Sequence, residues 1–270
     1  MTQGPARFGD LLPRALSSLV MGIIGIAAIW AGGWWFLALV AFAVGAMLWE
    51  LHAMLTPAPR RRHGALLAAM AGGAVFLSGI FPVGLVLPLA LLPSVAGIGL
   101  LRGNRSLFAG YGALIVLAGF GLFHLRQEFG LIWVFWLAGV VVATDVFGYF
   151  AGRVIGGPKF WPRVSPKKTW SGTVAGWVAS AVVGGVVMAM TGASVELLGM
   201  SVAMSMAAQL GDITESAVKR KVGVKDASHL IPGHGGLLDR FDGMLGAAIF
   251  LMLVERLVDF PPFGPAAAGL

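Results

Sequence analysis

The stretch Ser216 to Asp242, SAVKRKVGVKDASHLIPGHGGLLDRFD, is the most polar part of this chain, and the rest is organised around it. Its 27 residues include five Lys or Arg, three Asp and two His, with a Pro-Gly-His-Gly-Gly turn near the middle. The sequence on both sides is mostly apolar. A membrane protein does not gather so many charges for packing, because a charge that faces lipid is costly. We therefore expect this stretch to bind metal ions and phosphate groups at a bilayer surface.

The composition predicts an all-α protein, a polytopic integral membrane helix bundle. The chain has 270 residues, of which 58% are hydrophobic and 11% are charged, whereas soluble proteins carry about 25% charged residues. Apolar runs recur that are long enough to cross about 30 Å of hydrocarbon. A membrane β-barrel would instead have short segments of alternating hydrophobicity. The absence of cysteine excludes disulfides and thiolate metal sites.

Nine apolar segments predict nine transmembrane helices, the first retained as a helix and not removed as a signal peptide. We expect one integral domain, 1–270, in which residues 1–143 form N-terminal membrane helices and residues 144–270 form a catalytic portion with two cytoplasmic loops. The predicted spans are Ala15–Ala31, Trp34–Leu51, Gly64–Ile80, Val83–Leu101, Leu107–Leu122, Leu131–Ala151, Gly172–Met190, Leu197–Ile213 and Gly243–Val258.

The distribution of positive charge predicts the orientation. With nine spans, all of the 19 Lys and Arg residues except Arg126 and Arg256 fall on one side. The positive-inside rule places that side, with the N-terminus and both long polar loops, in the cytoplasm. We expect a multi-pass protein of a bacterial-type inner membrane whose active site faces the cytoplasm. The net charge of +7 then reflects topology and attraction to anionic lipids, and we expect no nucleic-acid partner.

A polar stripe follows one face of the eighth predicted span and continues beyond its end. The spacing of its members is that of a helix face, and Glu215 lies beside it. Such a stripe faces the bundle interior or a watery cavity. For the serines, a hydrogen-bonding seam between helices is an alternative; Asp212 leads directly into the charged stretch. The stripe consists of Ser201, Ser205, Gln209, Asp212, Ser216 and Lys219.

The glycine-rich turn and the residues after it predict a site for phosphate and metal. Pro232 and three glycines make a tight turn that leaves backbone amides uncovered ahead of a helix, an arrangement that attracts phosphate. Asp239 and Asp242 are three residues apart and point the same way on a helix. With Asp212 they form three hard oxygen ligands that suit Mg²⁺. Two alternatives are that the two aspartates only begin the helix favourably and that His234 only shapes the turn.

A third polar element follows the sixth predicted span. Asp145 lies inside an apolar run, which makes it a candidate functional residue, although an ion pair with Arg153 is an alternative. The segment Ser165-Pro166-Lys167-Lys168-Thr169 places two lysines and two hydroxyls before the next helix. These groups suit a polyphosphate, and the alternative is a basic loop that only touches anionic lipid headgroups.

The stretch from Ser216 to Asp242 resembles, position by position, the signature of the phosphatidate cytidylyltransferase family. The shared pattern is S-x-x-K-R-x-x-x-x-K-D-x-x-x-x-x-P-x-H-G-G-x-x-D-R-x-D. The upstream segments TDVFGYFAGR (144–153) and SPKKTW (165–170) are similar to a second block of that family, as is GD (211–212) followed by ES (215–216). The resemblance covers about Thr144 to Asp242, and the first half matches only as a set of membrane helices. Ser171 and Gly243 depart from the pattern, where many members have Glu and Ser, and only the role of position 171 is put in doubt.

This resemblance implies a reaction and its partners. CTP and phosphatidic acid would give CDP-diacylglycerol and pyrophosphate, with Mg²⁺ and a second cation such as K⁺ beside it, in a homodimer. The metal carboxylates of the family correspond to Asp212, Asp239 and Asp242. Two other hypotheses remain open: a CTP-dependent polyprenol or lipid-alcohol kinase, and a non-enzymatic lipid transporter.

In the predicted mechanism, the lipid phosphate attacks the α-phosphorus of CTP, and the protein positions and neutralises the anions. Besides the three metal carboxylates, the predicted catalytic residues are Lys219, Arg220 and His234. The predicted substrate-binding residues are Ser165, Lys167, Lys168, Thr169, Ser216, Lys225, Asp226, Gly235, Gly236, Arg240 and Asp145.

Overall fold

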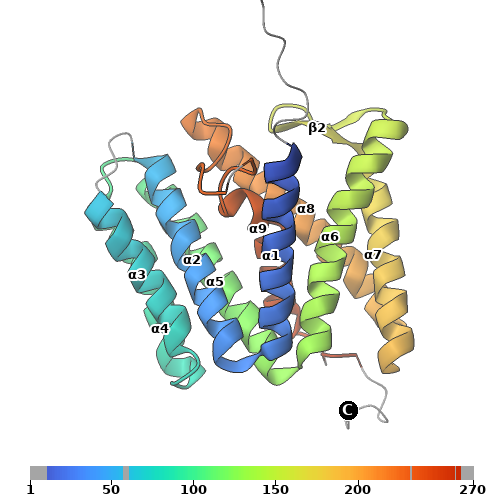
Figure 1. The fold of residues 1–270 in the computed structure, drawn as a ribbon, viewed down its shortest axis with the longest axis horizontal. Helices are drawn as coiled ribbons and strands as arrows, with labels where there is room; N and C mark the ends of the chain where they lie inside the picture. Colours follow the sequence, from blue (N-terminus) through green and yellow to red (C-terminus); the bar gives the residue numbers. More distant parts are fainter. Residues whose placement is uncertain (1–10, 57–60, 232, 259, 263–270) are drawn as a thin grey trace, which may run out of the picture.

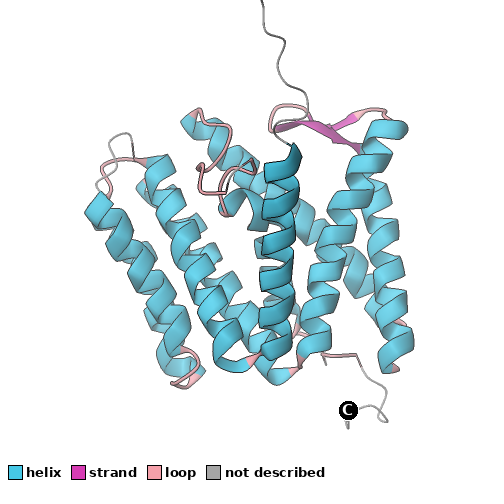
Figure 2. Cartoon of the chain, viewed as in Figure 1, coloured by secondary structure: helices cyan, strands magenta, loops and turns pink. Residues whose placement is uncertain are grey.

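The structure, a computed structural model, describes residues 11–56, 61–231, 233–258 and 260–262. Within these residues the chain forms nine helices and one two-stranded hairpin (Figures 1 and 2). The all-α prediction is confirmed, and each predicted apolar segment overlaps one helix. The elements are α1 (Leu11–Ala31), α2 (Gly33–Leu55), α3 (Arg61–Leu77), α4 (Val83–Leu100), α5 (Arg105–Glu128), α6 (Leu131–Val154), β1 (Lys159–Trp161), β2 (Ser165–Thr169), α7 (Trp170–Thr191), α8 (Glu196–Val222) and α9 (Leu238–Val254).

Helices that follow one another in the sequence pack side by side, as the short connections require. The pairs α2–α3, α4–α5, α6–α7 and α8–α9 are in extensive contact (Figure 1). Glycines allow the α2 and α3 backbones to approach closely: a Cβ atom on Gly72 would lie only 2.8 Å from the carbonyl oxygen of Ala41. Small residues at helix crossings are typical of membrane bundles.

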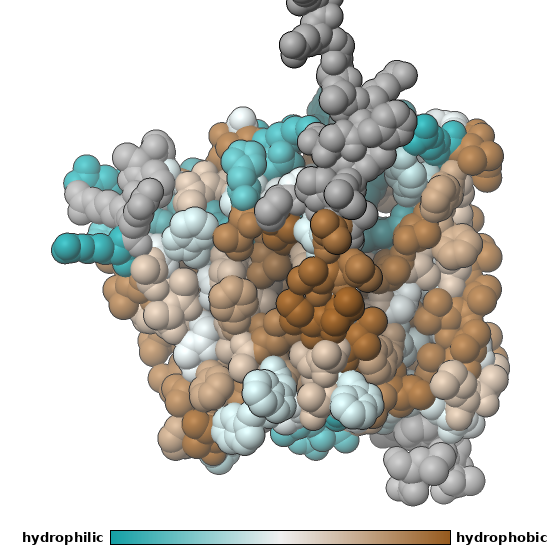
Figure 3. Space-filling model, viewed as in Figure 1, coloured by the Kyte–Doolittle hydropathy of each residue, from teal (hydrophilic) through white to brown (hydrophobic). Residues whose placement is uncertain are grey.

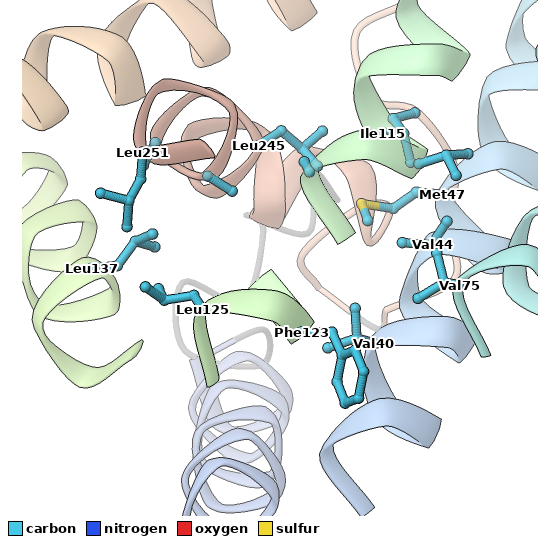
Figure 4. Close-up of a cluster of buried hydrophobic side chains, with 14 of the residues drawn as sticks. Val40, Val44, Met47, Val75, Ile115, Phe123, Leu125, Leu137, Leu245 and Leu251 are labelled. Atoms are coloured by element: carbon cyan, nitrogen blue, oxygen red, sulfur yellow. The ribbon is translucent and has the colours of Figure 1, made fainter. Parts of the chain in front are cut away.

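The bundle is apolar both inside and on its outer surface. Its interior includes Val44 of α2, Ile115 of α5 and Leu245 of α9 (Figure 4). Outside, Leu85 of α4 and Val182 of α7 are 63% and 62% exposed. Apolar residues dominate the middle of the face seen in Figure 3, and polar residues gather toward its upper and lower ends. Extended exposed apolar surface of this kind is unfavourable in water, so the chain is a membrane protein.

Four helices of the described residues, α2, α5, α6 and α7, are long and apolar enough to cross a membrane by length and composition. The described parts of α1, α3 and α4 are shorter apolar helices. Helices α8 and α9 are not among these candidates; α8 carries the polar stripe, and α9 carries Asp239, Arg240 and Asp242 near its start. The nine-span topology therefore stays a prediction. Arg7, Arg60 and Pro232 lie outside the described residues.

Two local features differ from the prediction. The polar segment after α6 was expected to be a loop, but β1 and β2 pair as an antiparallel hairpin in which Lys159 lies opposite Thr169. The hairpin is anchored by Phe160, whose ring packs 4.7 Å from that of Trp170. Helix α8 also continues past its predicted span and ends at Gly223, whose φ of 77° suits a glycine C-cap.

Candidate active site

A polar pocket of about 320 Å³ lies between α6, β2, α7 and α8. It brings together side chains from four separate elements: Asp145 from α6, Lys167 and Lys168 from β2, Thr173 from α7, and Asp212 from α8. Asp145, Lys167, Lys168, Thr169 and Asp212 were all predicted site residues, and all five line this pocket. The pocket therefore places both acidic and basic groups around one space.

The charges of the pocket are arranged around Asp212. Lys168 Nζ forms an ion pair with Asp212 Oδ2, and Ser216 Oγ donates a hydrogen bond to Asp212 Oδ1 at 3.3 Å. Arg153 does not pair with Asp145, since its Nη1 atom donates to the hydroxyl of Tyr149 at 2.7 Å. Asp145 instead lies within range of the charges of Asp212 and Lys168, so its carboxylate belongs to the pocket.

Thr169 has a structural role in addition to lining the pocket. Its Oγ1 atom accepts a hydrogen bond from the amide of Gly172 at 3.2 Å, which makes it the N-cap of α7. Ser171 Oγ lies 3.0 Å from Thr169 Oγ1. The side chain at position 171 therefore takes part in the hydrogen bonding at the start of α7. Ser165 begins β2 outside the pocket lining.

Asp239, on the first turn of α9, is the centre of a second polar group. Its Oδ1 atom accepts from Lys219 Nζ at 2.6 Å. Its Oδ2 atom accepts from the amides of Ala227 and Gly236, both at 2.8 Å. Lys219 also forms an ion pair with Glu215, one turn earlier on α8. The ammonium group of Lys219 thus joins two carboxylates from different helices. Asp239 in turn holds the loop between α8 and α9 through the amides of Ala227 and Gly236.

The surroundings of Asp239 favour its charged form. Burial alone would raise the pKa of this carboxyl, which precedes the predicted span 243–258. The ammonium of Lys219 and the two amides outweigh burial and hold the pKa of Asp239 below its ordinary value. Asp239 therefore remains an anion fixed in one orientation.

Glu50, near the end of α2, is the polar residue that the sequence reasoning missed. It is fully buried. Its Oε1 atom accepts from Ser228 Oγ at 2.6 Å and from the amide of Leu237 at 2.9 Å, and its Oε2 atom accepts from the amide of Leu238 at 2.8 Å. Glu50 thus caps α9 from the other half of the chain. Glu50 is the one acidic residue in the predicted span Trp34–Leu51. A charged residue inside an apolar run is the same signal that identified Asp145 as a candidate.

The glycine turn is formed as predicted, but its amides are not uncovered. Gly233 and Gly235 have φ values of 77° and 83°, a region that glycine adopts without strain. The sequence predicted that uncovered amides at this turn, with Gly235 and Gly236 among the binding residues, bind phosphate. The amides of Gly236, Leu237 and Leu238 instead donate hydrogen bonds to the carboxylates of Asp239 and Glu50. Two carboxylates of the protein therefore occupy the start of α9.

His234 joins the turn to the first helix. Its Nδ1 atom lies 2.8 Å from Ser17 Oγ and its Nε2 atom 2.9 Å from Ser18 Oγ. Its carbonyl oxygen accepts from Arg240 Nε at 3.1 Å. These contacts support the alternative in which His234 shapes the turn, and they extend its role to holding α1 against the loop.

Asp212 and Asp242 lie where the backbones of α8 and α9 approach closely. A side chain on Gly211 would collide with the backbone of Asp242 and Gly246, so only glycine permits this approach. Asp242 Oδ1 accepts from the amide of Gly243 at 2.7 Å, and its carboxylate lies within range of the charges of Asp212 and Asp145. Three carboxylates, one each from α6, α8 and α9, therefore influence one another electrostatically.

The carboxylates fit a divalent cation by their chemistry, since hard oxygen ligands are those that Mg²⁺ prefers. Across the described residues, no three His, Asp or Glu side chains are placed to hold a metal ion as they stand. Lysines neutralise them instead: Lys168 pairs with Asp212 and Lys219 with Asp239. The metal assignment of Asp212, Asp239 and Asp242 stays a prediction.

The remaining predicted residues surround this site. The 223–237 loop and the hairpin lie toward the same end of the bundle (Figure 1), which is the end where the positive charges were expected to gather. Four side chains there are exposed to solvent: Arg220, Lys225, Asp226 and Arg240.

The stripe on α8 divides into two parts. Toward its start, the hydrogen-bonding seam is observed: Trp136 Nε1 donates to Ser201 Oγ at 2.9 Å, and Ser205 Oγ lies 2.7 Å from Thr144 Oγ1. Trp177 Nε1 donates to Gln209 Oε1 at 3.0 Å. Gln209 also lines the pocket, and from Asp212 onward the stripe contributes to the pocket and to the group around Asp239.

The comparison with known proteins agrees with this arrangement. A model described as the cytidylyltransferase family matches residues 12–258. The chain belongs to the cytidylyltransferase family. It is 36% identical over 264 residues to the phosphatidate cytidylyltransferase of Brucella abortus (strain 2308), covering 93% of this chain and 96% of that protein. The resemblance drawn from the 216–242 stretch is therefore confirmed, and it extends through the first half of the chain.

Two further members of the family match over a shorter length. The phosphatidate cytidylyltransferase of Helicobacter pylori (strain 26695) is 42% identical over 134 residues, or 49% of this chain and 50% of that protein. The enzyme of the same name from Bacillus subtilis is 39% identical over 134 residues, or 48% of this chain and 50% of that protein. Similarity to these two members is thus confined to about half of the chain.

Proposed function

We propose that this chain is a membrane-embedded phosphatidate cytidylyltransferase. It transfers the cytidylyl group of CTP to phosphatidic acid, giving CDP-diacylglycerol and pyrophosphate. The observation that carries this proposal is similarity, along nearly the whole chain, to a protein of that name. The pocket formed by Asp145, Lys167, Lys168 and Asp212 supplies the charged surroundings that two anionic substrates require.

The reaction needs positioning and neutralisation more than a special nucleophile. An oxygen of the lipid phosphate forms a bond to the α-phosphorus of CTP, and the bond from that phosphorus to the β-phosphate oxygen breaks. Its electron pair leaves with pyrophosphate. Lys167 and Lys168 line the pocket and lie where they lower the repulsion between the two phosphates. Arg220, Lys225 and Arg240 are exposed to solvent, and they would attract the triphosphate and help the leaving pyrophosphate depart.

A divalent cation completes the proposal. Asp212, Asp239 and Asp242 would hold Mg²⁺, with a second cation such as K⁺ beside it. A bound Mg²⁺ would supply positive charge at the phosphate oxygens that attack and leave. The contribution of Lys219 is to hold Asp239 in a fixed orientation as an anion. Lys168 pairs with Asp212 and can exchange this partner for a substrate phosphate.

The site would face the cytoplasm of a bacterial cell, in a nine-span protein of the inner membrane with a cytoplasmic N-terminus. Because the chain has no cysteine, single cysteines report this topology directly. Lys225→Cys, in the loop after α8, should react with a membrane-impermeant maleimide only in inverted vesicles. Val195→Cys, in the turn before α8, should react only in intact spheroplasts. The opposite pattern would overturn the orientation.

We also expect a homodimer, as the family resemblance implies. Native mass spectrometry of the protein released from detergent would measure its subunit number. A single subunit under all detergent conditions that preserve activity would contradict the dimer.

The experiment that tests the activity is transfer of label from α-³²P-CTP to phosphatidic acid by the purified protein with Mg²⁺. The label should enter a lipid in the wild type and in Glu128→Gln, an exposed position at the end of α5. The Asp239→Asn variant should lose this activity. Label recovered as CDP would identify a kinase, and intact CTP with bound phosphatidate would indicate binding or transport.

A further inference from the structure

An apolar cavity of about 250 Å³ lies inside the bundle, apart from the polar pocket. It is lined by residues of α1, α2, α5, α6 and α9 together with Leu237, and these residues all have apolar side chains or are glycine. Val40, Val44 and Met47 of α2 line one wall and Leu245 of α9 lines another; all four are labelled in Figure 4. Its lining has no hydrogen-bonding side chain, so it suits a hydrocarbon and not a nucleotide.

One end of the cavity lies beside the residues of the active site. Leu237 and Phe241 line it and flank Asp239 on the first turn of α9. Leu237 is also the residue whose amide is held by Glu50. The α1 part of the lining runs from Met21 to Ile29, which is a length of about 12 Å at the helical rise of about 1.5 Å per residue. The cavity is therefore an elongated space that begins next to the carboxylates.

The cavity reaches the outer surface of the bundle beside α1. Ile24 of α1 and Phe42 of α2 line the cavity and are 49% and 69% exposed. The exposed side of α1 forms much of the strongly apolar area in the centre of Figure 3. A lipid chain can therefore reach the cavity from the bilayer by passing along one helix.

We propose that this cavity holds one acyl chain of the lipid substrate, with α1 as its outer wall and the lipid phosphate beside the carboxylates. The proposal rests on the proposed function and adds a location for the chain. Hydrocarbon is the occupant that the lining favours, because any polar ligand would lose its hydrogen bonds there. The contacts of Ser17 and Ser18 with His234 tie the wall to the loop that carries the site.

Two glycines of α1 offer a matched pair of variants. A Cβ atom added at either Gly22 or Gly25 meets no atom within 4 Å, so α1 should tolerate a larger side chain at both positions. Gly25 lines the cavity and Gly22 does not. Gly25→Phe therefore fills the cavity, and Gly22→Phe places the same ring on the outer surface.

The first measurement is activity on water-soluble dihexanoyl phosphatidate. Burying one methylene contributes about 0.8 kcal/mol. If Gly25→Phe excludes two methylenes, kcat/KM should fall about fifteenfold. Gly22→Phe should remain within about twofold of the wild type, since it leaves the cavity open. Equal values for both variants would overturn the proposal.

The second measurement is photo-crosslinking with a long-chain phosphatidate that carries a diazirine in its acyl tail, read out by peptide mass spectrometry. We expect label on Met21, Met47 or Met244 in the wild type and in Gly22→Phe, and its loss in Gly25→Phe. Label confined to Leu19 and Ile23 would overturn the cavity. If the cavity residues are labelled but the protein transfers no cytidylyl group, the proposed function is refuted, whereas the acyl-chain site is supported.

Discussion

Replacing Glu50 tests whether a buried carboxylate of the first half of the chain supports the catalytic loop of the second. Glu50→Ala removes three hydrogen bonds at once and leaves the amides of Leu237 and Leu238 without an acceptor. Hydrogen bonds to charged groups contribute about 1.5–3 kcal/mol each, but such contributions are not additive. Breaking a buried charged set typically costs about 3–5 kcal/mol, and we expect a loss of about 4 kcal/mol in unfolding free energy.

Glu50→Gln is the graded variant. With its amide oxygen at the position of Oε1, glutamine keeps the bonds from Leu237 and Ser228. Its NH₂ group then faces the amide of Leu238, so one bond becomes a contact between two donors. We expect a loss of about 2 kcal/mol, half that of alanine.

The assay is thermal unfolding in detergent, followed by tryptophan fluorescence. At roughly 2–4 °C per kcal/mol for a chain of this size, Glu50→Ala should lower Tm by about 10 °C and Glu50→Gln by about 5 °C. Glu128→Gln is the matched control, since Glu128 is exposed at the end of α5, and its Tm should not change. A Tm for Glu50→Ala equal to that of the control would refute the reasoning.

Three further variants test other contacts of the site. Lys168→Ala removes the counter-charge of Asp212 and should lower kcat/KM for CTP by about a hundredfold; an unchanged value would remove this lysine from the site. Thr169→Ala removes the N-cap of α7 and should cost about 1 kcal/mol in a chemical or thermal unfolding assay, and an unaltered transition would contradict that role. Gly236→Ala would place a Cβ atom 2.7 Å from Glu50 Oε1 and should reduce both Tm and activity. Wild-type values for both would show that the loop can shift without consequence.

The helices could be predicted from the sequence because their signal is local. Each apolar segment can satisfy its backbone hydrogen bonds within a helix where water is excluded, and each overlaps one helix in the structure. The ends were less well predicted. Helix α8 continues to Val222 because its polar residues, such as Glu215 and Lys219, are four apart and pair on one face.

The hairpin could not be predicted in this way. Strands β1 and β2 have only three and five residues, and neither has the alternation that identifies a strand. Their pairing depends on where α6 ends and α7 begins, which is a property of the fold.

The sequence predicted most of the residues of the candidate site but not the contacts between them. Asp145 and Asp212 were each identified as charges in apolar surroundings, but only the packing of α6 against α8 shows that they share a pocket. The hydrogen-bond partners of Asp239 could not be predicted either, because the amides that donate to it lie on a loop with no periodic pattern. Glu50 carried the same local signal as Asp145, and its partners lie 178 to 188 residues away along the chain.

The seam along α8 has a consequence for how far this protein can move. Ser201, Ser205 and Gln209 bond to α6 and α7 at intervals of one helical turn. Sliding or rotating α8 would break all three bonds together, in a setting where lipid offers no replacement partners. The seam therefore fixes the axial position of α8 against α6 and α7, and we expect substrates to move to Asp212 while this helix stays in place.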